Sequence, residues 1–416
     1  MLYNNNKNHF PNQDVIYYNC LSYGAGTANA PASLASFEET RTQPFLINPQ
    51  DYFMSIVRFS IDAANVPLFI CPVIVNPSNP DDLNFTPFTV TFLYNDVTYT
   101  ANLSYIPNDD YHLPKAPTAT SQDLSGYYYF VYYYSIFVKM INNALQQAFN
   151  LVIAANPSLA GVPAPYAIFD TTTERLSLIF PNIIVDGVNL FTVQYNSKNI
   201  PIYYPHQPVG TCYLLVNNLL YPYMESIESF VLIDYIPSVQ FLISVQDTHN
   251  NYYYPEQNAA NTTTTQTLTS FTNAGNNYTV APNWFIFTQQ YSHVTAWNSL
   301  ASIVFLTQMP IQPEFVPTFN NFSPNNTSAS SSLPILTDFV PDLEQAGQQR
   351  TRFNYVPTGP YRLIDINATV PLNKIQFQIY WVDRLQNLYP MRISFGQTNS
   401  VKLMFIKKSF YKSLTK

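Results

Sequence analysis

Residues 374–383, with the sequence KIQFQIYWVD, alternate between apolar and polar side chains with a period of two. Ile375, Phe377, Ile379 and Trp381 occupy every second position. Because successive side chains on a strand point to opposite faces, this pattern predicts a strand with one buried face. A regular strand near the end of a chain is typical of the closing edge of a β-sandwich, and nothing in this one is arranged for chemistry. The segment therefore favours a structural protein.

Strand patterns recur along most of the chain. Residues 52–61 are rich in β-branched and aromatic side chains, which favours a strand. Alternating residues on both sides of Asn95-Asp96 predict a hairpin with a two-residue turn. Further strands are expected at residues 176–180, 190–195, 241–246, 284–289 and 302–307.

One segment has the period of an amphipathic helix, at about residues 135–149. Its apolar residues recur at spacings of three and four, which places them on one helix face. Ser135 is the expected N-cap, and Asn156-Pro157 follows the expected end. We expect this face to pack against a sheet rather than to bind a cofactor. The apolar positions are Phe137, Met140, Ile141, Ala144, Leu145, Ala148 and Phe149.

The composition is poor in charge and rich in aromatic residues. Charged residues make up 10% of the chain and aromatic residues 16%, including 33 Tyr, whereas about 25% charged residues is usual. The centres of protein interfaces show the same two biases. The composition therefore predicts extensive contact with other subunits. An extracellular β-protein with an uncharged surface remains the alternative.

Three cysteines, Cys20, Cys71 and Cys212, form neither a disulfide framework nor a metal-binding spacing. We expect buried, reduced thiols and folding in a reducing compartment. The first residues lack the apolar core of a signal peptide, and no run of about 18 apolar residues is present, so no membrane span is expected.

The end of the chain is basic. Residues 350–416 contain 11 Lys and Arg and 2 Asp and Glu, a formal charge of +9, and the rest of the chain carries −16. Lys407, Lys408 and Lys412 are the candidate residues for contact with nucleic acid or with an acidic neighbouring subunit. A solvated tail is the alternative interpretation.

No arrangement of residues indicates catalysis, a cofactor or a metal. The acidic run before His112, Asp109-Asp110, is more typical of a loop than of a ligand cluster, and Gly24-Ala25-Gly26 lacks the third glycine of a phosphate-binding loop. Glu38-Glu39 is more typical of surface carboxylates than of a hydrolase pair. We therefore expect a protein that is not an enzyme. The five histidines are widely separated: His9, His112, His206, His249 and His293.

Several segments resemble capsid proteins of small eukaryotic DNA viruses, in the virophage, Polinton-like or adintovirus-like group. Residues 37–44 (FEETRTQP), followed by residues 48–52 (NPQDY) and 55–59 (SIVRF), are similar to the opening strands of those proteins. Further similar stretches are residues 127–149, 217–230, 288–292, 297–299 and 361–405.

The resemblance implies an all-β, antiparallel jelly-roll sandwich. We expect two tandem jelly rolls, one in residues 1–237 with the helix at 135–149 and one in residues 238–416 with the basic tail. The implied function is that of a capsid subunit in the virion, folded in the host cytoplasm or nucleus. Its implied partners are copies of itself, other capsid proteins and, through the tail lysines, viral DNA.

Three alternatives for the role stay open at this point. A major capsid protein that forms trimers is favoured over a penton or minor capsid protein with one jelly roll, which would form pentamers. A glycan-binding attachment sandwich would use aromatic residues such as those at 127–129 and 252–254 to stack on sugars. A secreted hydrolase is the remaining class.

Overall fold

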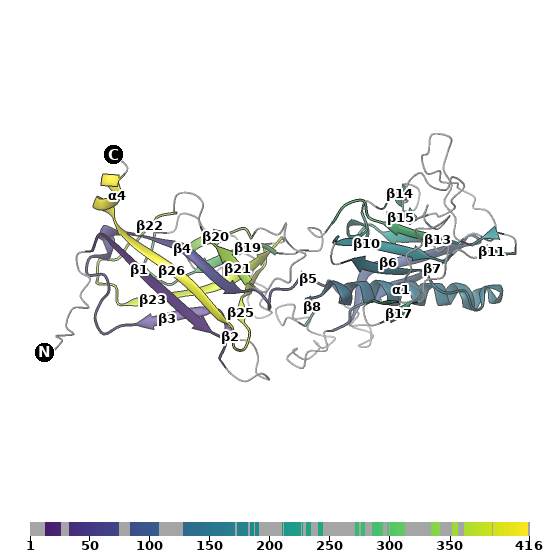
Figure 1. Cartoon of the computed structure of the whole chain (residues 1–416), viewed down its shortest axis with the longest axis horizontal. Coiled ribbons are helices and arrows are strands. Elements are labelled where there is room, and N and C mark those ends of the chain that lie inside the picture. Colours follow the sequence, from purple (N-terminus) through teal and green to yellow (C-terminus); the bar gives the residue numbers. More distant parts are fainter. Residues whose placement is uncertain are drawn as a thin grey trace.

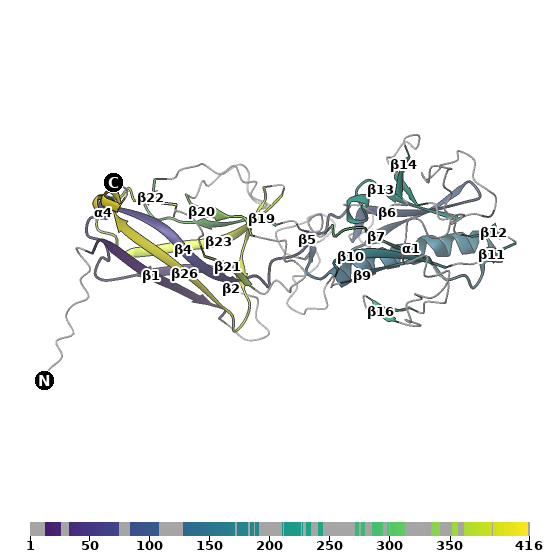
Figure 2. The same cartoon turned by 45° about the horizontal axis from the view of Figure 1, so that its top comes forward.

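The structure is a computed structural model of the chain, and its described residues form two packed units that lie end to end (Figure 1). Figure 2 shows the same two units after rotation, with β1 and the short helix α4 (Lys408–Leu414) both on one of them. The described residues are 13–25, 33–74, 84–107, 128–170, 173–181, 184–186, 188–190, 210, 212–225, 227, 230–233, 240–243, 271–273, 276–278, 285–293, 298, 300–312, 334–341, 352–356, 362–384 and 386–414.

The first unit, here called the terminal sandwich, takes its strands from both ends of the chain. One sheet has the order β1-β26-β4-β21, with β22 also beside β4, and the other has β20-β19-β23, with β3 and β24 both beside β23. The strands are β1 (Val15–Tyr23), β3 (Ser36–Thr40), β4 (Tyr52–Asp62), β19 (Leu300–Leu306), β20 (Ile335–Phe339), β21 (Arg352–Tyr355), β22 (Ile364–Asp365), β23 (Lys374–Asp383), β24 (Leu388–Pro390) and β26 (Thr398–Lys407).

The main strands of this sandwich follow the winding of a jelly roll. Numbered from one to eight along the chain, β1, β3, β4, β19, β20, β21, β23 and β26 give the sheet orders 1-8-3-6 and 2-7-4-5. Two antiparallel sheets wound in this Greek-key order make the eight-stranded jelly roll. The expected antiparallel jelly-roll class is therefore confirmed.

The core of the terminal sandwich joins residues that are far apart in the sequence. Ile375 and Phe377 of β23 are buried with Met54 of β4 and Leu403 of β26. The other expected inward residues of β23, Ile379 and Trp381, are also buried, so the predicted half-buried strand is confirmed.

The second unit, here called the middle unit, is inserted between β4 and β19. One of its sheets has the order β14-β15-β13-β6-β7 and another has β18-β10-β9. Its main elements are α1 (Tyr134–Ala155), β6 (Phe85–Tyr94), β7 (Val97–Ser104), β9 (Tyr166–Asp170), β10 (Arg175–Phe180), β13 (Cys212–Asn217), β14 (Phe230–Ile233), β15 (Gln240–Ile243) and β18 (Phe285–Thr288). Short strands and 3-10 turns of both units complete the fold: β2 (Ser33–Leu34), β11 (Ile184–Val185), β12 (Val188–Asn189), β16 (Phe271–Asn273), β17 (Asn276–Tyr278), β25 (Arg392–Ile393), η1 (Pro49–Asp51), η4 (Pro157–Leu159) and η5 (Tyr221–Tyr223).

This strand pairing differs from the expected division into residues 1–237 and 238–416. Strands β1, β3 and β4 pair with β26 and β23 from the other end of the chain, so these strands lie in one sandwich. The described strands of the middle unit have a different order, so they do not form a second, tandem jelly roll. The physical reason is that period-two alternation reports which face of a strand is buried but not which strand it pairs with.

The predicted helix is present and longer than expected. All seven apolar residues of the predicted stripe are buried on α1. Ser135 is not the N-cap: the helix begins at Tyr134, and its N-cap residue, Tyr133, makes no side-chain capping bond. Asn156 is the C-cap residue of the helix, and its Nδ2 donates to the carbonyl oxygen of Val152 at 2.9 Å.

A buried polar residue ties α1 to the neighbouring sheet, and periodicity did not predict it. Asn142 donates from Nδ2 to the carbonyl oxygen of Ala167 in β9 at 2.9 Å, and its Oδ1 accepts from the N–H of Ala167 at 2.6 Å. A buried amide is tolerated when its donor and acceptor are both used. Asn142 therefore fixes the position of α1 along β9.

The two-residue turn between β6 and β7 is confirmed. Asn95 and Asp96 have φ values of 49° and 61°. Positive φ at both central residues is the mark of the turn that matches the right-handed twist of a hairpin, and Asn and Asp adopt it more readily than most residues. The Asn95 side chain also accepts a bond from the N–H of Gly210 at 2.7 Å.

A two-stranded ribbon, here called the linking ribbon, joins the two units. It pairs β5 (Phe69–Ile70) with β8 (Phe130–Val131), and Figure 1 shows it between them. Phe69 and Val131 belong to the core of the middle unit, whereas Phe130 belongs to the core of the terminal sandwich. The Phe130 ring meets Trp381 and Tyr389 edge to face, with centroid distances of 5.8 Å in both cases.

We expect Phe130→Ala to lower the free energy of unfolding by about 3 to 5 kcal/mol, because it leaves a cavity beside Trp381 and Tyr389. Urea unfolding followed by tryptophan fluorescence measures the loss. Tyr133→Ala is the control, since that side chain is exposed and should change stability by no more than about 0.5 kcal/mol. Equal stability of the two variants would contradict the expected contribution of Phe130 to this core.

Candidate functional site

The basic end of the chain folds back onto the terminal sandwich. Helix α4 follows directly after β26 and packs on the outward face of the sheet β1-β26-β4-β21. Tyr411 meets Phe53 of β4 edge to face at 5.9 Å between centroids. Beneath the helix, Val57, Met404 and Ile406 form a small apolar cluster. The helix thus covers one apolar part of this outward face.

The three candidate lysines have different surroundings. Lys408 forms an ion pair with Asp365, with Nζ 2.6 Å from Oδ1, and its Nζ lies 5.3 Å over the Phe53 ring. Lys407 is partly buried, and its backbone N–H donates to the carbonyl oxygen of Asp14 at 2.8 Å. Lys412 is exposed in the last turn of α4. The structure brings the three to one end of the sandwich, and their contact with DNA or a partner stays a prediction.

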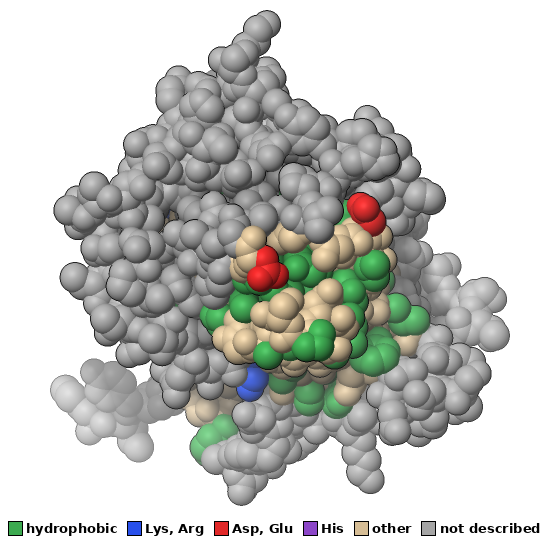
Figure 3. Space-filling view, turned by 90° about the vertical axis from the view of Figure 1, so that its right-hand side faces the viewer, with side chains coloured by type: hydrophobic (Ala, Val, Ile, Leu, Met, Phe, Trp, Pro, Cys, Tyr) green, Lys and Arg blue, Asp and Glu red, His purple; other side chains and the backbone are tan. Residues whose placement is uncertain are grey.

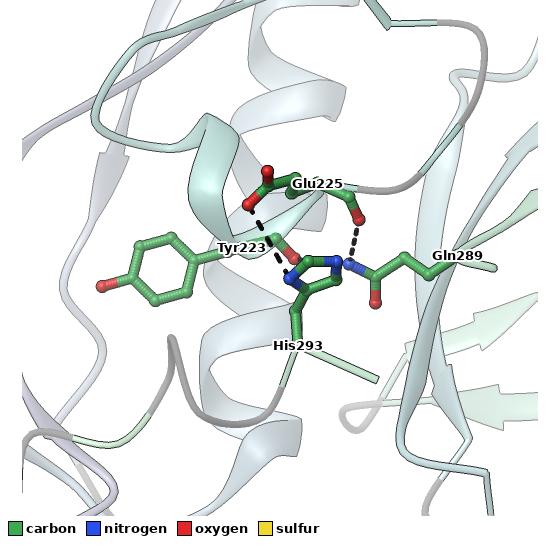
Figure 4. A network of polar contacts seen from close by, with 4 residues as sticks. All are labelled: Tyr223, Glu225, Gln289 and His293. Carbon is green, nitrogen blue, oxygen red and sulfur yellow. Dashed lines mark hydrogen bonds and ion pairs between the residues drawn. The ribbon is translucent and has the colours of Figure 1, made fainter. Parts of the chain in front are cut away.

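A polar network in the middle unit is the closest approach to a catalytic arrangement (Figure 4). Gln289 is buried, and its Nε2 donates to the carbonyl oxygens of Tyr223 at 3.2 Å and Glu225 at 2.9 Å. Its Oε1 accepts from the N–H of Leu176 at 2.8 Å. These bonds satisfy main-chain groups between η5 and β10, which is a structural role.

His293 lies beside this network, with Nδ1 3.8 Å from Oε2 of Glu225. Burial lowers the pKa of His293, and the carboxylate of Glu225 acts in the opposite direction. In the part of the chain that the structure describes, no group of three or more His, Cys, Asp or Glu residues could hold a metal ion. The other four histidines and Asp109-Asp110 lie outside the described residues.

The other sequence candidates have ordinary surface or core roles. Glu38 pairs with Lys374 at 2.7 Å, and Glu39 pairs with Arg41 at 2.9 Å. The three cysteines are free and buried, as expected. Burial is the main cause that raises the pKa of Cys20, to about 12, and it raises the pKa of Cys71 and of Cys212 as well. Buried thiols of this kind are unreactive.

Most of the aromatic run at 127–129, which a glycan-binding protein would use for stacking on sugars, is buried. Tyr128 and Tyr129 are buried, and they pack on each other with ring centroids 4.9 Å apart. The run at 252–254 lies outside the described residues. Among the described helices, none is long and apolar enough to cross a membrane.

We expect the stability of the protein to fall as the pH drops below about 6.5, in part through His293. Its pKa is lower in the folded than in the unfolded chain, so below this pH the unfolded chain binds more protons and is favoured. Urea unfolding at about pH 8 and about pH 5.5 measures the loss, and His293→Gln should reduce it. The same loss in both proteins would contradict this role.

Comparison with known proteins gives the family. Residues 16–407 match the family described as Sputnik minor capsid protein V18/19. The chain belongs to this family. It is 28% identical to structural protein V19 of Sputnik virophage over 258 residues, which are 59% of this chain and 95% of V19. It is also 33% identical to the uncharacterized protein V18 of Sputnik virophage over 160 residues, 37% of this chain and 90% of V18.

Two solved structures are similar along nearly the whole chain. A chain in the cryo-EM structure of the Sputnik virophage is 27% identical, with a TM-score of 0.69, and the match covers 96% of this chain and 99% of that one. The crystal structure of the mavirus penton protein has a TM-score of 0.55 over 94% of this chain and 99% of that one. At 14% identity, the second likeness concerns the fold alone.

These matches confirm the virophage resemblance and correct the expected role. The matched family carries the name of a minor capsid protein, so the expectation of a major capsid protein is not supported. The alternative, a penton or minor capsid protein with one jelly roll, fits better. It also agrees with the single jelly-roll order among the described strands.

Proposed function

We propose that this protein is a minor capsid protein of the penton type, in which five copies form a ring in the virion shell. The observation that carries the proposal is the single jelly roll built from both ends of the chain, with the middle unit inserted between β4 and β19. In this arrangement the terminal sandwich supplies the shell wall. The middle unit projects from one end of it (Figure 1).

The surface agrees with a structural rather than an enzymatic role. The described part of the far end of the middle unit shows mainly hydrophobic and uncharged side chains, with charged groups at few places (Figure 3). Leu151 of α1 and Val97 of β7 are about half exposed. Surfaces of this composition suit contact with other proteins. The protein would fold in the host cell and then act in the virion through copies of itself and other capsid proteins.

The ring can be tested by the native mass of the purified protein. We expect a species of five times the 47.5 kDa subunit, measured by native mass spectrometry at several concentrations. Closed rings arise when each subunit uses one surface to bind a different surface of the next. A trimer as the largest specific species would contradict the ring of five.

We also propose that Lys407, Lys408 and Lys412 contact viral DNA on the inner side of the shell. Their position at one end of the terminal sandwich supports the proposal, because it gathers positive charge from β26 and α4. The partner Asp365 already neutralises Lys408, which reduces the contribution of this lysine.

Changing Lys407 and Lys412 to Gln should weaken binding of duplex DNA and make it less sensitive to salt. Each lost phosphate contact lowers the slope of log affinity against log salt by about 0.9. Fluorescence anisotropy with a labelled duplex at several salt concentrations measures both effects. The control is Lys139→Gln, which removes a positive charge from α1 of the middle unit. An unchanged slope would contradict the contact.

A further inference from the structure

The outward face of the sheet β1-β26-β4-β21 carries two like charges directly opposite each other. Lys402 of β26 pairs in register with Arg58 of β4. Both point away from the core, because their neighbours Leu403 and Phe59 point into it. Like charges placed opposite on antiparallel strands are destabilising. The pair of Lys402 and Arg58 therefore lowers the stability of the sheet in a single copy.

Neither charge is neutralised within the described part of the chain. Lys402 lies 4.5 Å over the ring of Tyr17 and has no ion pair there. Arg58 is exposed and makes neither a hydrogen bond nor an ion pair with any described residue. Two cations side by side, with no ion pair to a described residue, form a ready site for carboxylates or phosphates, which accept charge-assisted bonds from Arg and Lys.

A third cation lies nearby on the same face. Arg352 of β21 donates from Nε to Oγ of Ser60 at 3.0 Å and from Nη2 to the carbonyl oxygen of Thr398 at 2.5 Å. Its partners are neutral. Asp62, opposite Arg352 in the register, instead accepts from the N–H groups of Ala64 and Ser394. We call Lys402, Arg58 and Arg352 the cationic face.

An exposed apolar stripe borders the cationic face. Tyr17, Leu21 and Tyr23 alternate along β1 and are 55%, 62% and 70% exposed. In register they lie beside the outward residues of β26. Aromatic and Arg side chains together are typical of the residues that contribute most to protein interfaces. This combination favours a protein surface as the occupant.

We infer that the cationic face and the stripe of β1 bind an acidic surface of a second copy of this chain. The inference rests on the proposed ring and names one of its contacts. The charge distribution supports it: residues 350–416, which supply Lys402 and Arg352, carry +9, whereas the rest of each copy carries −16. DNA fits this face less well, because the exposed apolar stripe of β1 beside it suits a protein surface better than a phosphate backbone. In a ring, each copy presents this face to a different surface of the next one.

The test compares the full chain with the double variant Arg58→Gln and Lys402→Gln. We expect its ring to dissociate at concentrations at least ~10 times higher than the wild type at low salt, because charged groups are lost from the contact. Native mass spectrometry over a dilution series measures this. At a dilution where both proteins are dissociated, the thermal midpoint of the variant should equal or exceed that of the wild type, because the like-charge pair is gone. The control is Lys139→Gln, which removes a positive charge from α1, away from the cationic face.

The outcomes are distinct. Loss of assembly in the double variant alone, with an unchanged or raised thermal midpoint, supports the inference. Assembly equal to the wild type overturns it and leaves the proposed ring intact. Unchanged assembly with lost binding of a short duplex DNA would also overturn it, since the occupant would then be nucleic acid. A wild-type chain that stays monomeric at every concentration would contradict the ring itself.

Discussion

The arrangement of the molecule depends on the linking ribbon, which is shared between two hydrophobic cores. Because side chains on a strand alternate between faces, Phe69 and Val131 enter the core of the middle unit while Phe130 enters that of the terminal sandwich. A flexible linker would let the inserted unit move independently. Here the paired strands bury aromatic surface on both sides. The inserted unit is therefore held as an extension of the jelly roll.

Local patterns predicted the elements that depend on residues close in sequence, whereas the strand expected at 190–195 lies almost wholly outside the described residues. The alternation in β23, the stripe of α1 and the turn at Asn95-Asp96 each depend on residues close in sequence. The pairing of β1 with β26 does not, because it joins Val15 to Ile406. Long strands with regular alternation fit many partners equally well, so the sequence alone suggested two consecutive sandwiches. The insertion between β4 and β19 could only be seen once the pairing was known.

The candidate site shows the same limit. The basic composition of the last residues pointed to Lys407, Lys408 and Lys412, but not to the ion pair between Lys408 and Asp365, whose partners are distant in sequence. Arg58 gave no signal, because one cation in a strand is unremarkable until its neighbour is known. The bulge beside Lys402 sets Arg58 opposite that lysine. Which charges lie opposite one another across a sheet depends on the strand register, and sequence patterns do not specify that register.

The outward face of this sheet is divided between two kinds of contact. Helix α4 covers Val57, Met404 and Ile406, which removes apolar surface from water within one chain. Lys402 and Arg58, next along the same strands, are left uncovered and mutually repelling. In the proposed ring, the division separates what one copy satisfies alone from what a second copy would satisfy.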